Sequence, residues 1–118
     1  MERLTAQEEQ VMKIIWQVGK GNVKSFIEMG SLDMPYTTVA SIVKNLEKKD
    51  YLKTSKKLNA YEYEPLLTAQ QYADGNMQDV VGDFFDNSYK NLVSFFLEQE
   101  KINEQELEEL LQMIKNRP

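Results

Sequence analysis

The side chains with the most evident chemistry are lysines and small hydroxyl groups in the middle of the chain. Residues 44–57 contain six Lys and only two acidic residues, Glu47 and Asp50. Lysine ammonium groups bind phosphate oxygens as point charges, and Ser or Thr hydroxyls contact base edges and phosphates. Together these groups predict contacts with double-stranded DNA.

Two residue types are absent from the sequence, which contains no Cys and no His. This composition excludes disulfides, iron–sulfur clusters, thiolate zinc sites, cysteine nucleophiles and histidine acid–base catalysis. The acidic residues Asp74, Asp79, Asp83 and Asp86 are too loosely spaced to predict a metal site. No nucleophile–base pair or phosphate-binding loop is visible, so we expect neither enzymatic activity nor a cofactor.

A helix predicted over residues 35–49 would carry most of the polar groups. At the 3.6-residue period its apolar side chains share one face, and the opposite face holds hydroxyl, amide and ammonium groups without a carboxylate. A solvated surface helix would show the same pattern, but the basic segment that follows favours DNA. The residues expected to contact DNA are Tyr36, Thr37, Thr38, Ser41, Lys44, Asn45, Lys48, Lys49, Lys53, Lys56, Lys57 and Tyr61.

A β-hairpin with a basic tip is predicted directly after this helix. Two Tyr alternate with two Glu over residues 60–65, which is the period of a strand, and Pro65 stops it. Residues 51–57 supply the other strand, and Asn59 suits the turn between them. The hairpin lysines are therefore expected to neutralise phosphates, with Tyr61 supporting the hairpin.

Two shorter helices are predicted before residue 35, one beginning after a capping box at Thr5 and one after a cap at Asn22. Three helices and then a hairpin is the order of a winged helix-turn-helix, whose third helix enters the major groove and whose hairpin is the wing. The expected fold is mostly α with a small β-hairpin. We expect a winged-helix DNA-binding domain at residues 1–67 and a helical dimerisation domain at residues 68–118.

The second of these domains should contain short, strongly apolar helices. Capping signals occur at Thr68 and Asn103, and a bend or break is expected at Asp74-Gly75-Asn76. Helices this short cannot bury their aromatic residues alone, so burial between two chains is expected, with a two-fold axis that matches a palindromic operator. The side chains expected at the dimer interface are Phe84, Phe85, Tyr89, Leu92, Val93, Phe96, Leu107, Leu110, Leu111 and Ile114.

The net charge of −5 conceals an asymmetry between the two halves. Residues 1–67 hold ten Lys or Arg against nine acidic residues, whereas residues 68–118 hold four against ten. A basic patch in one half and an acidic second half suggest a division of labour. The start shows no signal-peptide core, and no apolar run approaches the roughly 20 residues that span a membrane. We therefore expect a cytoplasmic protein without membrane insertion.

The chain resembles the penicillinase repressor family, which comprises beta-lactamase and methicillin-resistance repressors and their copper-responsive relatives. Four segments carry the resemblance, in the same order and over nearly the whole chain. They are residues 4–16, Tyr36-Thr37-Thr38-Val39 with Leu46-Glu47-Lys48-Lys49, Ala60-Tyr61-Glu62-Tyr63-Glu64-Pro65-Leu66, and Phe84-Phe85 with Ser88, Leu92-Val93 and Phe96. The second segment is similar to the family's recognition helix and is the most specific; the fourth resembles its dimerisation region.

The resemblance implies a homodimeric repressor whose partners are operator DNA, a second copy of the chain and a membrane sensor protease pathway. In the antibiotic-responsive members, cleavage in the dimer domain lifts repression, and the corresponding region here is Ser94, Phe95 and Phe96. Three residues depart from the family's pattern. Phe95 stands where cleaved members have Asn, Asn45 where a basic residue is usual, and Asp50 where Gly is usual.

The expected function is transcriptional repression by a homodimer that reads a palindromic operator through the 35–49 helix and a basic wing. The resemblance implies relief of repression by sensor-triggered proteolysis. Two alternatives stay open. Asn45, Asp50 and the low net charge would also suit a winged-helix protein-interaction module without DNA binding. A small ligand bound between the aromatic helices would instead make the protein a ligand-gated regulator.

Overall fold

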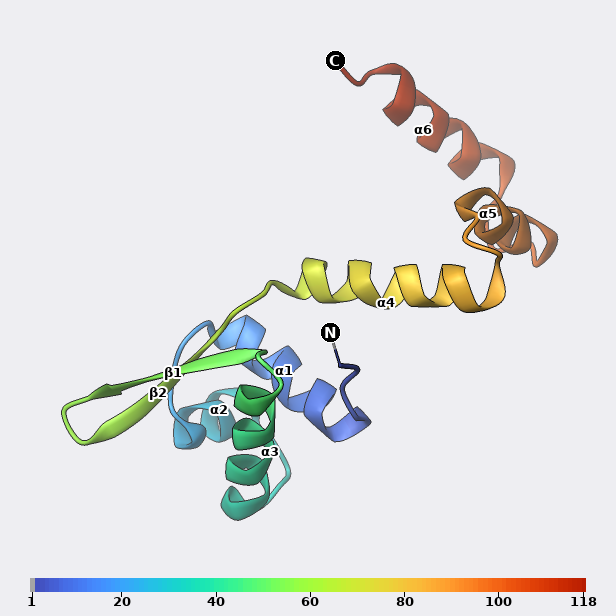
Figure 1. Cartoon of the computed structure of the whole chain (residues 1–118). Coiled ribbons are helices and arrows are strands. Elements are labelled where there is room, and N and C mark those ends of the chain that lie inside the picture. The colour runs from blue at the N-terminus through green and yellow to red at the C-terminus, as the bar shows by residue number, and fades with distance from the viewer. Residues whose placement is uncertain (1) are drawn as a thin grey trace. The chain divides into compact units, whose positions relative to one another are not determined.

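The structure is a computed structural model that describes residues 2–118. These residues form two compact units, the first ending at Asn76 and the second spanning Met77–Pro118. In chain order the elements are α1 (Ala6–Val18), α2 (Val23–Gly30), α3 (Tyr36–Lys48), β1 (Leu52–Lys57), β2 (Ala60–Pro65), α4 (Ala69–Phe84), α5 (Tyr89–Glu98) and α6 (Glu104–Lys115) (Figure 1). The described residues thus confirm the predicted fold class, mostly helical with one small hairpin in winged helix-turn-helix order.

Reciprocal hydrogen bonds set the starts of the first two helices. The Thr5 hydroxyl accepts from the Glu8 amide at 3.2 Å, and the Thr5 amide donates to Glu8 Oε1 at 2.9 Å. Asn22 and Ser25 make the same pair of bonds at the start of α2. α1 ends at Gly19, whose φ of 91° favours glycine. The capping residues predicted for both helices are therefore confirmed.

The core of the first unit lies where the apolar faces of α1, α2 and α3 meet the start of the hairpin. The apolar face predicted for the third helix is buried, through Val39, Ile42, Val43 and Leu46. The other buried hydrophobic side chains of this core are Val11, Met12, Ile15, Val23, Phe26, Tyr51, Leu52 and Tyr63. Because burial of one helix face turns the opposite face to solvent, this core orients the polar side of α3.

The hairpin has the two-residue turn that its sequence predicted. β1 and β2 pair antiparallel with Lys57 opposite Ala60, which leaves Leu58 and Asn59 in the turn. Leu58 has a φ of 58°, and its side chain is 95% exposed. The hairpin extends away from the three helices of its unit (Figure 1). Its strands therefore form an arm with a solvated tip.

A second pairing ties the hairpin to the segment that begins α2. The Tyr63 amide donates to the Gly21 carbonyl at 2.8 Å, and the Gly21 amide donates to the Tyr63 carbonyl at 3.1 Å. A Cβ at residue 21 would lie 2.5 Å from Ser25 Oγ, closer than atoms can approach. A side chain at residue 21 would therefore crowd Ser25 and Phe26 in the first turn of α2.

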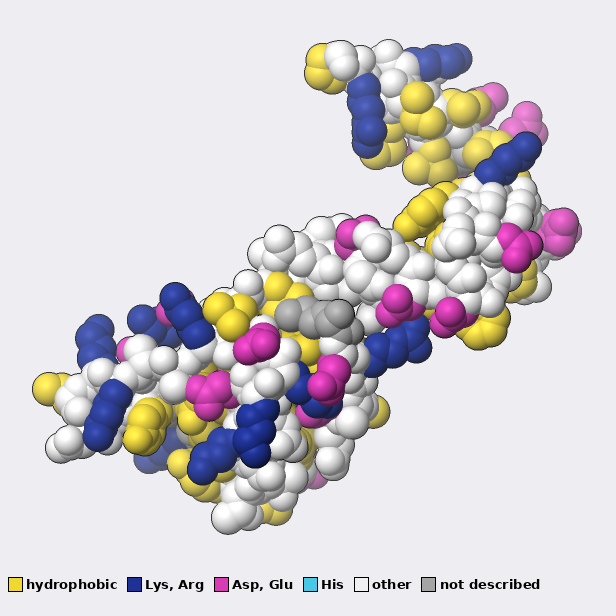
Figure 2. Space-filling model, in the orientation of Figure 1, with side chains coloured by type: hydrophobic (Ala, Val, Ile, Leu, Met, Phe, Trp, Pro, Cys, Tyr) yellow, Lys and Arg dark blue, Asp and Glu magenta, His cyan; other side chains and the backbone are white. Residues whose placement is uncertain are grey.

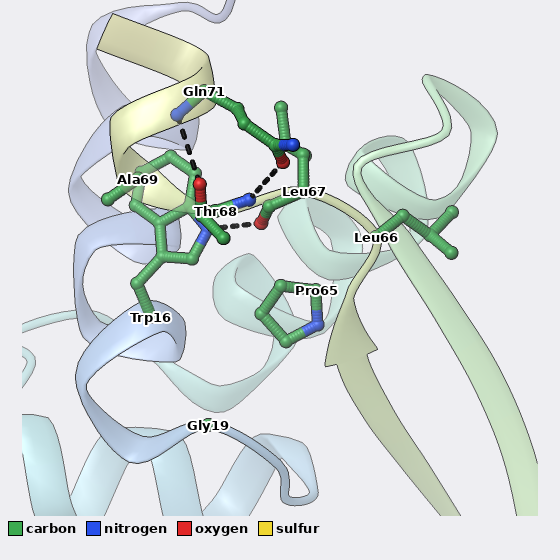
Figure 3. A pocket seen from close by; sticks show the side chains of 8 residues that line it. All are labelled: Trp16, Gly19, Pro65, Leu66, Leu67, Thr68, Ala69 and Gln71. Atoms are coloured by element: carbon green, nitrogen blue, oxygen red, sulfur yellow. Dashed lines mark hydrogen bonds between the residues drawn. The ribbon is translucent and has the colours of Figure 1, made fainter. Parts of the chain in front are cut away.

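Trp16 and the first turn of α4 hold the junction that follows the hairpin. The Trp16 indole nitrogen donates to the Leu67 carbonyl at 2.9 Å, and the ring packs against Tyr72 at 5.5 Å between centroids. Thr68 and Gln71 form the predicted capping box, which Figure 3 shows beside the indole. These groups line a mainly apolar hollow of about 440 Å³. The hydrogen bonds among these groups fix where α4 begins.

The break expected at Asp74-Gly75-Asn76 does not occur, because α4 continues from Ala69 to Phe84 as one helix. A Cβ at Gly75 would meet nothing within 4 Å, so the packing around residue 75 does not require a glycine. A single Gly costs only about 1 kcal/mol relative to Ala in a helix, which is too little to end a helix that continues on both sides. The boundary between the two compact units nevertheless falls inside α4, between Asn76 and Met77.

The second unit is built from short helices with their own caps. Asp86 and Asn87 adopt left-handed φ angles of 53° and 60°, and Ser88 then caps α5. A capping box between Asn103 and Glu106 begins α6, as predicted. Val81 is the only buried side chain among the described residues 77–118. The helices of this unit therefore leave most of their apolar surface open to solvent.

Candidate nucleic-acid interface

The polar face of α3 is open to solvent from its first turn to its last. The side chains of Thr37, Ser41, Lys44, Asn45 and Lys48 are exposed, as is Tyr36, while Thr38 is half-buried. Pro35 begins the helix without a side-chain cap, so the amides of the first turn can reach an external acceptor. The face therefore presents hydroxyls, an amide and two ammonium groups, as the helical period predicted.

The C-terminal end of α3 forms a Schellman motif. Asp50 has a φ of 65°, its amide donates to the Glu47 carbonyl at 3.0 Å, and the Tyr51 amide donates to the Leu46 carbonyl at 2.9 Å. Glycine adopts this left-handed conformation more readily than any residue with a Cβ. Asp50 thus occupies a position that favours glycine, and it adds an exposed carboxylate at the end of a basic helix.

Lys49 differs from the other lysines predicted to contact DNA, because its ammonium is paired with a buried carboxylate. Its Nζ lies 2.7 Å from Glu8 Oε1 and 3.9 Å from Glu2 Oε2. Glu8 is only 4% exposed. Burial is the largest influence on the pKa of Glu8 and raises it, but the bonds and charge of Lys49 and the bonds from Thr5 together hold that pKa below 4.5. This pair joins the end of α3 to the start of α1.

The hairpin carries three lysines on β1, and one of the two tyrosines of β2, Tyr61, is exposed. Lys56 Nζ lies 5.7 Å from the centroid of the Tyr61 ring, within the range of a cation–π contact. Lys53 Nζ is 3.3 Å from Glu64 Oε1, so it is partly neutralised. Lys57 is exposed, and Figure 2 shows dark-blue side chains over the hairpin. The basic tip expected from the sequence is therefore present on the surface.

A groove of about 560 Å³ lies between the start of α2, α3 and the hairpin. Its lining residues are Asn22, Val23, Lys24, Tyr36, Ala40, Lys44, Asn59, Ala60, Tyr61 and Tyr63. None of them carries a carboxylate. Burial raises the pKa of the Tyr63 phenol. The groove brings together three of the predicted DNA contacts, Tyr36, Lys44 and Tyr61.

Two further residues, Asn22 and Lys24, line this groove, and neither was expected there from the sequence. Asn22 was expected only to cap α2, and its Oδ1 does accept from the Ser25 amide at 2.8 Å. Lys24 is exposed in the first turn of α2, and no local pattern distinguishes it from other lysines. The pairing of Gly21 with Tyr63 brings α2 beside the wing, and a contact between such distant residues leaves no local signal.

The side chains predicted for the dimer interface lie at the surface of the second unit. Phe84 is 77% exposed and Ile114 is 66% exposed. Tyr89, Val93, Leu110 and Leu111 are also exposed, and Phe85, Leu92, Phe96 and Leu107 are half-buried. Yellow side chains of this unit are visible in Figure 2. Exposed apolar side chains in such number indicate an interaction surface.

The segment that corresponds to the family's cleavage region lies inside α5. The Phe95 ring packs edge-on against Phe85 at 5.4 Å and against Phe96 at 5.7 Å between centroids. Ser94 and Phe96 are half-buried. This segment is therefore held in a helix by aromatic contacts within its own unit.

Within residues 2–118, no three acidic side chains gather into a group that could hold a metal ion. No helix in the same range is long and apolar enough to cross a membrane.

A three-helix unit with a paired hairpin and an exposed polar face on its third helix defines a winged helix-turn-helix protein. The sequence pattern of the penicillinase repressor family matches residues 4–116. The chain belongs to the penicillinase repressor family, which confirms the resemblance seen in the sequence. Members of this family are transcriptional repressors, so the chain is a DNA-binding transcriptional regulator and not an enzyme.

Two relatives align with most of the length of this chain. The penicillinase repressor of Bacillus licheniformis is 25% identical over 114 residues, which are 95% of this chain and 89% of that protein. The methicillin resistance regulatory protein MecI of Staphylococcus aureus strain N315 is 22% identical over 109 residues, which are 91% of this chain and 89% of that protein.

Solved structures of other regulators show a more distant likeness. The oxidised form of MarR from E. coli matches 95% of this chain and 74% of that chain, with a TM-score of 0.49 and 14% identity. BpsR of Bordetella bronchiseptica, studied for regulation of its DNA binding by 6-hydroxynicotinic acid, matches 95% of this chain and 73% of that chain, with a TM-score of 0.48 and 17% identity.

Proposed function

We propose that the chain represses transcription as a homodimer that reads a palindromic operator with α3 and the hairpin. The observation that carries this proposal is the exposed polar face of α3, which holds no carboxylate and adjoins a basic hairpin. Membership of a repressor family supports it. In a winged helix-turn-helix, such a face enters the major groove while the wing contacts the adjoining DNA.

The proposal gives the two basic elements different roles. Thr37, Ser41 and Lys44 contact base edges or nearby phosphates, because they share the outward face of α3. The side chains proposed for phosphate contacts are Lys48, Lys53, Lys56 and Lys57, with Tyr36, Thr38, Asn45 and Tyr61 beside them. Since its ammonium is paired with Glu8, we assign Lys49 to positioning the end of α3.

The second unit is proposed to join two copies of the chain. Its exposed aromatic and aliphatic side chains would be buried between the copies, which supplies the burial that its short helices lack. A two-fold axis would then present two α3 helices to half-sites about one helical turn apart. In functional terms we propose a DNA-binding domain at residues 1–67 and a dimerisation domain at residues 68–118.

Relief of repression is proposed to follow cleavage of the chain at Ser94, Phe95 and Phe96. A protease acts on extended backbone, so α5 must open locally and separate Phe95 from Phe85 before cleavage. A sensor that cuts here must also accept Phe95 in place of the Asn of cleaved members. Mass spectrometry of the chain recovered from beta-lactam-treated host cells tests this route: two fragments split at residues 94–96 support it, and an intact chain with lifted repression excludes it.

The proposed DNA binding is tested by the variant Lys56→Ala/Lys57→Ala. Both side chains are exposed at the wing, so their loss should leave the fold intact. We expect weaker binding to every duplex and a salt slope lower by about two units, since each phosphate contact adds about one. Fluorescence anisotropy of a labelled duplex at several salt concentrations measures both quantities.

The matched control is Lys90→Ala/Lys101→Ala, which removes two exposed lysines from the second unit. This control should bind with the salt slope of the unaltered chain. Equal slopes for the wing variant and the unaltered chain would remove the hairpin from the proposed interface.

A further inference from the structure

The groove between α2, α3 and the hairpin is a built feature of the first unit. Two hydrogen bonds between Gly21 and Tyr63 fix its walls, because they hold β2 against the segment that starts α2. The other wall is the outward side of α3, which contributes Tyr36, Ala40 and Lys44. Three elements therefore enclose one concave, solvent-filled space.

The groove offers hydrogen-bond donors and positive charge without a competing carboxylate on its lining. Lys24 and Lys44 supply two ammonium groups, and Tyr36 and Tyr61 supply two phenols. Lys24 has one acidic neighbour, Glu28, at 4.0 Å, but both side chains are mostly exposed and such a pair contributes little. Lys44 makes no ion pair with any residue that the structure describes. Both ammonium groups can therefore bind an anion.

A bound duplex would supply that anion at this place. With α3 in the major groove and the wing beside it, one strand of the sugar–phosphate backbone must pass between the two elements. The groove lies between these same elements and opens to solvent. A phosphate group accepts hydrogen bonds from lysine, tyrosine and amide donors together, and these are the donor types on the groove's lining.

We propose that this groove holds a backbone phosphate of the operator, with Lys24 on α2 as a phosphate contact opposite Lys44 on α3. The inference rests on the proposed DNA binding and extends it to a third element, α2. The phosphate then fixes the position of α3 along the major groove, because it is held from α2 and the wing at the same time.

The test compares Lys24→Ala with Lys13→Ala in anisotropy titrations of the full chain against duplex DNA over a range of salt. The two lysines are matched, since each is largely exposed and each pairs with a Glu four residues away on its own helix. Lys13 does not line the groove. We expect Lys24→Ala to lower the salt slope by about one unit and to weaken binding equally across sequences. Lys13→Ala should leave both quantities unchanged.

A second readout locates the contact on the DNA. Ethylation of individual phosphates should reveal one position per half-site where modification blocks the unaltered chain but has little further effect on Lys24→Ala. Equal slopes for the Lys24 and Lys13 variants, with no such phosphate, would overturn the inference. If Lys56→Ala/Lys57→Ala still lowers the slope, the proposed DNA binding survives that result; if it too has no effect, the proposed function fails as well.

Discussion

Glu8 is a single residue that links α3, the helix proposed to enter the major groove, to the rest of the first unit. Its carboxylate is buried and bonded to Lys49 at the end of α3, and its pKa lies below the ordinary 4.5. Because the folded pKa is lower than the unfolded one, the charged carboxylate stabilises the fold. This contribution is complete above the unfolded pKa and is lost as pH falls through the lowered folded value.

We therefore predict that Glu8→Gln changes the pH dependence of stability. The free energy of unfolding of the unaltered chain should fall as pH drops from about 5 toward 3, and this fall should be shallower in the variant. At neutral pH the variant should be less stable by roughly 1–3 kcal/mol, since Lys49 loses its charged partner. Urea denaturation across this pH range measures both effects.

The control for Glu8 is Glu28→Gln, which alters an exposed carboxylate that also pairs with a lysine. It should leave the pH dependence almost unchanged. Identical pH profiles for Glu8→Gln and the unaltered chain would contradict the role assigned to the buried pair.

Residue chemistry was predictable where it follows the helical period and unpredictable where it depends on distant partners. The outward direction of Thr37, Ser41 and Lys44 follows from the apolar side chains on the opposite face of the same helix. The pairing of Lys49 does not, because Glu8 lies 41 residues away in sequence. The local sequence therefore carries no signal for this pair, which depends on the packing of α1 on α3.

At the scale of elements, the end of α3 carries a testable strain. Asp50 adopts a left-handed conformation that costs most residues about 1–2 kcal/mol, although Asp tolerates it better than most. We predict that Asp50→Gly raises the free energy of unfolding by about 0.5–1 kcal/mol. It should also strengthen DNA binding, since a carboxylate leaves the basic end of the helix. Thermal denaturation and anisotropy titration measure the two effects.

Glu100 supplies a matched control, because it occupies the same position of a Schellman motif after α5, with a φ of 56°. Glu100→Gly should stabilise its own helix end without any change in DNA affinity. If both variants bound DNA more tightly, or if neither did, the result would contradict a position of Asp50 on the DNA-binding side of the molecule.

Element starts were more predictable than element continuity. Each capping box joins residues three apart, as Thr5 with Glu8 and Asn103 with Glu106 do, so the sequence contains the whole signal. The path of α4 through Gly75 depends on the small energetic difference between continuing and ending a helix, and the glycine alone indicated the wrong outcome. The groove beside α2 depends on tertiary pairing and had no signal at all.

At the scale of the whole molecule, the proposed dimerisation would let two DNA-binding domains bind the two half-sites of a palindromic operator together. We predict that Leu110→Gln/Ile114→Gln reduces the sedimentation mass from that of two chains to that of one. Both side chains are exposed in the single chain, so the substitutions should not unfold it. The affinity for a full palindrome should fall toward that for a half-site, because the two heads then bind independently.

Leu58→Gln is the control for this variant, since Leu58 is an even more exposed leucine outside the second unit. It should remain dimeric. A single-chain mass for the unaltered protein at micromolar concentration would contradict the dimer assignment directly.

The central claim is that this chain is a dimeric reader of a specific operator, and selection from a random pool of duplex DNA tests it most directly. Purified protein should be used at two salt concentrations, and the bound fragments sequenced. We predict enrichment of a palindrome with half-sites about one helical turn apart, bound much more weakly at the higher salt. A folded dimer that enriches no sequence at either salt would contradict the account and identify the chain as a winged-helix module for protein partners.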